Sequence, residues 1–189
     1  MPWRPHPDDV LEGHGACGHA RGVAVPDRLF RSLDRARLDE ALLAVVGDGL
    51  AADVLAVARA RDAYAGHGRI RPLHLASQAL TARLDEIFQL RRVPVFLRDR
   101  PRPHRRQGGR IVYEVFGLCE QDGPLEVYTR TPARAQPVAL RTFLDTLLHE
   151  WVHHYDFERF GESVHNAGFY ERCKQLEERA RGALALGGY

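Results

Sequence analysis

The sequence predicts an α+β fold in which N-terminal helices, a small antiparallel sheet, a long helix and a final helix follow one another. Apolar residues recur at steps of three and four up to about residue 92 and again beyond residue 137, as in amphipathic helices. Between these regions the pattern changes to short β-rich runs bounded by turn residues. The 189 residues, 44% hydrophobic and 28% charged, suffice for one ordinary globular core.

The N-terminal part divides into a tail and a helical segment. Residues 1–25 are rich in Pro, Gly, His and Asp and lack apolar periodicity, so we expect a flexible tail. Residues 26–72 carry an apolar stripe of helical period, which Gly47 and Gly49 are expected to break into two helices. The remainder, residues 73–189, is predicted to form the main domain.

The middle of the chain predicts a helix and a few strands. A helix is expected over about 73–92 and a short strand over 93–97, early or at a sheet edge because of its proline. The runs 111–118 and 125–131 flank the turn signal EQDGP and predict an antiparallel hairpin. Segment 98–110, RDRPRPHRRQGGR, has no hydrophobic residue. We expect an exposed basic loop there, which could contact the phosphates of DNA.

The strongest helix signal lies near the C-terminus. Pro137 is expected to open this helix and Gly161 to end it. A last helix is predicted from Asn166, a good N-cap residue, toward Arg181. The stronger helix has one continuous apolar face, made by Leu140, Phe143, Leu144, Leu147, Leu148, Trp151, Val152 and Tyr155.

Charge and cysteine usage narrow the class of protein. A formal net charge of +2 is too small to require a nucleic-acid or membrane partner. The most apolar stretch is interrupted by Asp48 and Asp53, so no membrane span is predicted. The odd, widely spaced set of Cys17, Cys119 and Cys173 is not a disulfide framework, and no signal-peptide pattern is visible. We therefore expect a cytoplasmic protein.

The pattern His149-Glu150-Trp151-Val152-His153 lies inside the strong helix. Residues four apart on a helix are offset by about 40°, so the two histidines project from one face and can bind one ion. Glu150, about 100° from His149, can reach a water on that ion without displacing a ligand. Such a carboxylate can take the proton of the water as the water attacks a peptide carbonyl.

A catalytic zinc site needs a third protein ligand. Six candidates follow His153, and they are His154, Asp156, Glu158, Glu162, His165 and Glu171. Helix geometry removes His154 and Glu158, because both point elsewhere. The extended metzincin pattern would need a glycine at 156 and a histidine at 159, so the chain, with Asp156 and Arg159, does not fit that class. This leaves the three candidates beyond the expected break at Gly161, which are Glu162, His165 and Glu171.

The stretch TLLHEWVHHYDFERFGESVHNAGFYERC resembles the SprT-like metallopeptidases, which share a compact zincin fold. In that family a His-Glu-x-x-His helix is followed by a short connection, a third histidine and an aromatic on the next helix. The resemblance covers about residues 73–180. It implies that residues 73–189 form a zincin-like catalytic domain, with an active-site helix and a following helix that brings a further metal ligand.

The same resemblance implies roles for individual residues. His149, His153 and His165 match the ligands of Zn²⁺, and Glu150 matches the catalytic acid/base; Glu171 is the alternative third ligand. The chain lacks the Cys-x-x-Cys pair that many relatives carry, so we do not transfer their DNA-crosslinked protein substrates. The hypothesis is a zinc metallopeptidase that acts on a protein or peptide. The alternative is a non-catalytic, metal-containing module that binds nucleic acid or protein.

Overall fold

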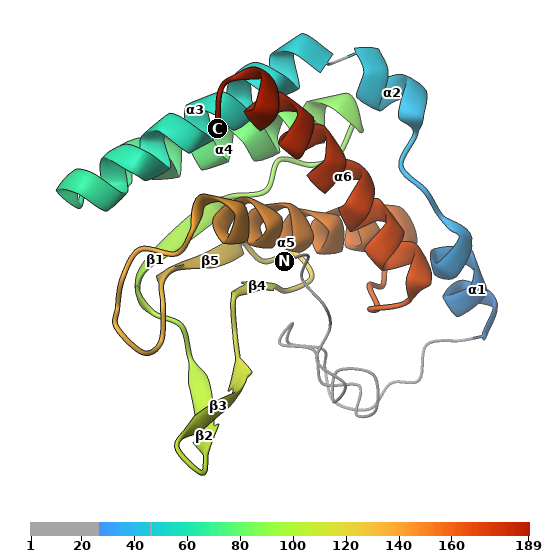
Figure 1. Cartoon of the computed structure of the whole chain (residues 1–189). Coiled ribbons are helices and arrows are strands. Elements are labelled where there is room, and N and C mark those ends of the chain that lie inside the picture. Colours follow the sequence, from blue (N-terminus) through green and yellow to red (C-terminus); the bar gives the residue numbers. More distant parts are fainter. Residues whose placement is uncertain (1–26, 46) are drawn as a thin grey trace.

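The predicted α+β class is confirmed in the computed structural model, which describes residues 27–45 and 47–189. In these residues six helices accompany a three-stranded sheet and a separate two-stranded hairpin (Figure 1). The expected tail, residues 1–25, lies outside the described part. None of the described helices combines the length and apolarity that a membrane crossing requires.

Within residues 27–45 and 47–189, four helices precede the sheet. Segment 26–72 was expected to hold two helices, but its described residues hold three and the start of a fourth. The extra break lies at residues 36–39, where the Asp39 carboxylate caps a new helix by accepting the backbone N–H of Ala41 at 2.8 Å. The helices are α1 (Asp27–Arg35), α2 (Glu40–Val45), α3 (Gly47–His67) and α4 (Ile70–Ile87).

The sheet has the order β1–β5–β4. It consists of β1 (Val95–Pro101), β4 (Gly117–Cys119) and β5 (Leu125–Arg130). The antiparallel hairpin expected around the EQDGP turn is confirmed for β4 and β5. However, β1 pairs parallel to β5, so the sheet is mixed rather than antiparallel. The segment between β1 and β5, which contains the separate hairpin and β4, is the crossover connection that a parallel pair needs.

The basic segment 98–110 is not a loop, which corrects the sequence prediction. Its first residues extend β1, and the rest enter an antiparallel hairpin of β2 (His104–Gln107) and β3 (Arg110–Glu114). The turn holds Gly108 and Gly109 at φ 56° and 78°, which favours glycine at both positions. Because residues 103–110 are all exposed, these strands lack the apolar alternation by which strands are recognised.

Helix α5 (Leu140–Phe160) begins three residues later than Pro137 predicts. The reason is that the preceding residues run extended beside β5, where the Val138 N–H donates to the Thr129 carbonyl at 2.9 Å. The predicted end is confirmed, since Gly161 adopts a left-handed φ of 75° at the C-cap.

Helix α6 (Ala167–Leu186) begins as predicted, because the Asn166 side chain accepts the Phe169 N–H at 2.9 Å. It packs against α3 and α5, and a single hydrophobic core joins these helices to α4 and the sheet (Figure 1). The core centres on the fully buried Trp151, whose indole N–H donates to the buried Asp85 carboxylate at 2.7 Å. Helix α5 is thereby held between the sheet and α6.

Candidate metal centre

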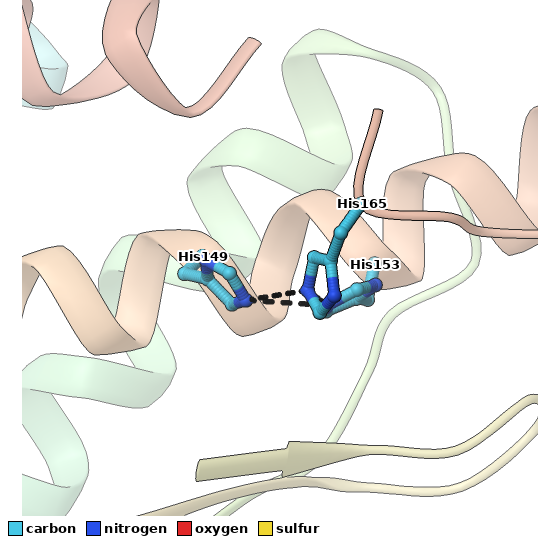
Figure 2. Close-up of side chains that lie close together, drawn as sticks. All are labelled: His149, His153 and His165. Atoms are coloured by element: carbon cyan, nitrogen blue, oxygen red, sulfur yellow. Dashed lines mark hydrogen bonds between the residues drawn. The ribbon is translucent and has the colours of Figure 1, made fainter. Parts of the chain in front are cut away.

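Three histidines from two segments converge beside α5. His149 and His153 project from one face of the helix, one turn apart, as their spacing predicts. His165 comes from the short connection between Gly161 and α6, and Figure 2 shows its ring directed at the other two. Among the described residues, these three form the group whose ligand atoms could hold a metal ion.

The spacing of the Nε2 atoms fits one ion between them. The separation is 3.3 Å for His149 and His153, 3.1 Å for His149 and His165, and 3.0 Å for His153 and His165. Two nitrogens bound tetrahedrally at about 2.0–2.1 Å from zinc lie about 3.3–3.4 Å apart. The triangle is therefore close to the size that a tetrahedral ion requires.

A buried hydrogen-bond chain fixes the tautomer of His153. The Ser163 hydroxyl donates to Asp156 Oδ2 at 3.1 Å, so its oxygen can accept the Nδ1–H of His153 at 2.7 Å. Burial raises the pKa of Asp156 to about 6 against the opposing effect of the Arg172 guanidinium 2.8 Å away, so the carboxylate is ionised at neutral pH. With its proton on Nδ1, His153 presents an Nε2 lone pair to the other two rings.

His149 also carries the protonation state that metal binding needs. Burial, reinforced by the neighbouring His165, lowers the pKa of His149 to about 3, so the ring is neutral at physiological pH. Its Nδ1 lies 4.0 Å from the sulfur of Cys173 on α6. Burial raises the pKa of the Cys173 thiol, which keeps that sulfur protonated.

Two aromatic residues of α6 support the histidine rings. The Phe169 ring lies 4.9 Å from His149, 4.3 Å from His153 and 4.8 Å from His165, measured between centroids. Tyr170 stacks on His165 at 5.9 Å with an interplanar angle of 15°. The rings therefore rest on an apolar wall, which restricts their rotation and pre-organises the nitrogen atoms.

Glu150 is buried between α5 and the sheet, with 3% of its surface exposed. It lies against Gly117 of β4, because a Cβ built on that glycine would be 2.6 Å from its Cγ and 2.7 Å from its Oε1. Only a glycine at this strand position leaves room for the Glu150 side chain. The sequence pattern predicts Glu150 but contains no sign of its contact with β4.

The other candidate ligands lie outside the histidine group. His154 points away, as expected, and its Nε2 lies 2.9 Å from the carbonyl of Arg91. Asp156 pairs with Arg172 instead. Glu162 and Glu171 are not in the group of ligand atoms that could hold an ion. The residue pattern left Glu162, His165 and Glu171 open, the family resemblance favoured His165, and the structure brings His165 to the pair on α5.

Three further polar residues, Asp145, Tyr113 and Tyr128, do not belong to the histidine group. Burial raises the pKa of Asp145, and the charges acting on it belong to Arg181 and Arg141. Tyr128 accepts a hydrogen bond from Arg100 at 3.4 Å, and Tyr113 is exposed on β3.

Sequence reasoning missed the residues that support the site. Ser163, Arg172 and Cys173 belong to no recognisable motif. Ser163 makes its contacts where the connection after Gly161 lies against α5, and Arg172 and Cys173 make theirs where α6 packs against α5 and α1. Gly117 gives a weak signal at most, as a glycine inside a β-rich run can mark the close approach of another group.

Comparison with known proteins adds no family to this description: no protein-family model matches the chain, and neither a curated protein nor a solved structure shows significant similarity. The functional conclusion therefore rests on the site itself. Its firm content is a group of three histidines that could hold a metal ion.

Proposed function

We propose that this protein is a zinc-dependent metallopeptidase in which His149, His153 and His165 bind Zn²⁺ and Glu150 is the general base. One observation carries the proposal. Three Nε2 atoms lie within 3.0–3.3 Å of one another, and a buried carboxylate follows the first of these histidines on the same helix. The resemblance of this stretch to the SprT-like metallopeptidases supports the same assignment.

The donor set favours zinc. Imidazole nitrogen suits a borderline-soft ion, and three such donors in a tetrahedral arrangement leave a fourth position for water or substrate. Catalytic zinc sites keep such an open position, whereas structural sites use four protein ligands. In the part of the chain that the structure describes, three ligands come together, and this number favours a hydrolase over a purely structural metal in a binding module.

The chemistry divides between the ion and the chain. Zinc, when bound, supplies positive charge that polarises the peptide carbonyl and lowers the pKa of water. Glu150 accepts the proton of the attacking water and then delivers it to the leaving amine. Gly117 leaves space for this carboxylate, and Ser163 holds His153 in the tautomer that directs its Nε2 lone pair at the ion.

Strand β4 offers an edge for an extended substrate. In the described residues it pairs only with β5, and the Tyr128 N–H donates to the Phe116 carbonyl directly opposite. Because hydrogen-bonded and non-bonded pairs alternate, the backbone groups of Gly117 and Cys119 face the free edge. A peptide added there would lie beside Glu150, and its main chain would supply the hydrogen bonds.

The β2–β3 hairpin is the proposed contact with DNA. Its Arg105, Arg106 and Arg110 are exposed, and no carboxylate forms an ion pair with them in the described residues. Arginine guanidinium groups bind phosphate oxygens well. The double variant Arg105→Glu/Arg106→Glu should bind single- and double-stranded DNA more weakly and with a smaller salt dependence. Unchanged binding would remove DNA from the proposal.

A reducing, cytoplasmic setting suits the free Cys119 and Cys173.

The experiment that tests the proposed activity is casein cleavage by wild type, Glu150→Gln and Glu171→Gln, each loaded with zinc. We expect Glu150→Gln to keep its zinc and to lose at least about 100-fold in rate, the usual contribution of general acid–base catalysis. Glu171→Gln, the matched control on α6, should cleave like wild type. A Glu150→Gln variant that cleaves at the wild-type rate would refute the mechanism and favour the binding module.

A further inference from the structure

We infer that the docking of helix α1 and the binding of metal are coupled, through a buried chain that runs from α1 by way of Arg172, Asp156 and Ser163 to His153. The inference rests on the metal site of the proposed function and does not depend on peptidase activity. Helix α1 is thereby assigned a role in positioning a metal ligand.

The buried chain of hydrogen bonds begins at the C-terminal end of α1. Arg172 of α6 is fully buried, and its NH1 donates to the carbonyls of Leu33 at 2.9 Å and Ala36 at 2.8 Å. The last carbonyls of a helix have no partner within the helix, so a cation placed there both satisfies them and complements the helix dipole. Arg172 is in this way the C-terminal cap of α1.

The Arg172 guanidinium also connects the end of α1 to the residues that hold the metal site. Its NH2 donates to Asp156 Oδ2 at 2.8 Å, and Ser163, which binds the same oxygen, holds His153. Arg172, Asp156, Ser163 and His153 are each 0% exposed. Since water does not reach these groups, the loss of one contact leaves a buried charge or donor without compensation. A shift of α1 therefore alters the partners that orient His153.

A second contact joins α1 to the other ligand segment. Gly168 lies in the first turn of α6, three residues after His165. A Cβ built on it would be 2.2 Å from the Leu33 carbonyl oxygen and 2.6 Å from that of Asp34. The α1 backbone thus rests directly on this turn, and only glycine permits the approach. The position of helix α1 therefore affects the positions of both His153 and His165.

Coupling of this kind is reciprocal. If docked α1 favours the histidine geometry that binds zinc, zinc must favour docked α1 by the same free energy. Metal binding should therefore slow the exchange of amide hydrogens in α1. Loosening of α1 should weaken zinc binding, although α1 supplies no ligand.

The first test is hydrogen exchange of the full chain with and without zinc. We expect zinc to slow exchange in Asp27–Arg35 more than in residues 57–64 of α3, which serve as the reference for a general gain in stability. Ser163→Ala should bind zinc about 10–100-fold more weakly, and when saturated should show less protection of α1. Zinc binding without extra protection of α1 would overturn the coupling. Failure of wild type to bind zinc would instead overturn the proposed function.

The second test uses two glycines of one helix. Gly168→Ala forces the α1 backbone away, whereas a Cβ on Gly182 meets no atom within 4 Å, so Gly182→Ala is the matched control. We expect zinc binding to weaken about tenfold in Gly168→Ala and to stay unchanged in Gly182→Ala. Combined with Ser163→Ala, the effect of Gly168→Ala should shrink, because both act through one chain. Strictly additive effects would contradict the coupling.

Discussion

At the scale of single residues, the site depends on which side chains have room beside α5. Glu150 is predicted from its place in the motif, but its orientation is set by β4, where Gly117 leaves space for the carboxylate. The Nδ1 atoms of His153 and His149 contact Ser163 and Cys173, and the Phe169 ring lies against all three histidines. The histidines and Glu150 are thus held by residues that lie outside the His-Glu-x-x-His pattern.

Gly117→Ala tests this placement of Glu150. The new Cβ would lie within 2.6–2.8 Å of Glu150 and of the Glu126 backbone carbonyl, and the backbone cannot yield easily. The carboxylate must therefore move. We expect proteolysis to fall by about 100-fold, since misplacement of about 1 Å at a catalytic group costs that much. Zinc affinity should stay within about twofold of wild type, and Gly182→Ala should be fully active. Wild-type activity in Gly117→Ala would show that Glu150 is not where we place it.

At this scale the sequence predicts what is local in the chain. The relation between His149, Glu150 and His153 follows from helix geometry alone. The contacts made by Ser163, Arg172 and Cys173 depend on how α6 and the connection before it pack against α5 and α1, and no spacing within one element contains that information. The position of His165 is only partly predictable from the sequence. The end of α5 at Gly161 is a local signal, but the path of the connection that brings His165 back to α5 is not.

At the scale of elements, the turn between α5 and α6 brings the third histidine to the other two. Gly161 ends α5 in a left-handed conformation, and Asn166 starts α6 directly after His165. Both end signals are predicted correctly because capping is local chemistry. The basic hairpin is not, since strands without a buried face lack the alternation that reveals them. The parallel pairing of β1 with β5 is not predicted either, because the two strands are far apart in the sequence.

Asn166→Ala tests how far the helix start positions His165. Loss of the side-chain bond to the Phe169 N–H should cost about 1 kcal/mol of the free energy of unfolding, measured by urea titration of the metal-free protein. Zinc binding should weaken as well, because His165 precedes the frayed turn. Asn166→Asp keeps the capping oxygen and should restore both properties. If Asn166→Ala lowers stability yet binds zinc like wild type, the cap does not position His165.

At the scale of the whole molecule, one core unites the N-terminal helices with the helices of the site. This arrangement lets the protonation of a site residue affect global stability. Burial lowers the pKa of His149 from its ordinary value of 6.5 to about 3, so the folded protein resists protonation that the unfolded chain accepts. The unfolded state therefore binds more protons between these pH values, and stability falls as the pH falls.

We accordingly expect the metal-free protein to lose about 1–2 kcal/mol of stability through His149 between pH 7 and pH 5. Urea unfolding at both pH values measures this loss. His149→Leu, which removes the titrating ring, should show a shallower decrease than wild type. An equal decrease in the two proteins would mean that the His149 ring does not resist protonation in the folded state.

The most direct test of the central claim is the zinc content of purified wild type beside His165→Ala and Glu171→Ala, measured by elemental analysis after dialysis. We predict about one zinc ion per chain in wild type and in Glu171→Ala, because each retains three imidazole ligands. His165→Ala should retain less than about a tenth of that amount, because only two protein ligands remain. Full zinc content in His165→Ala, with its loss in Glu171→Ala, would contradict the three-histidine site.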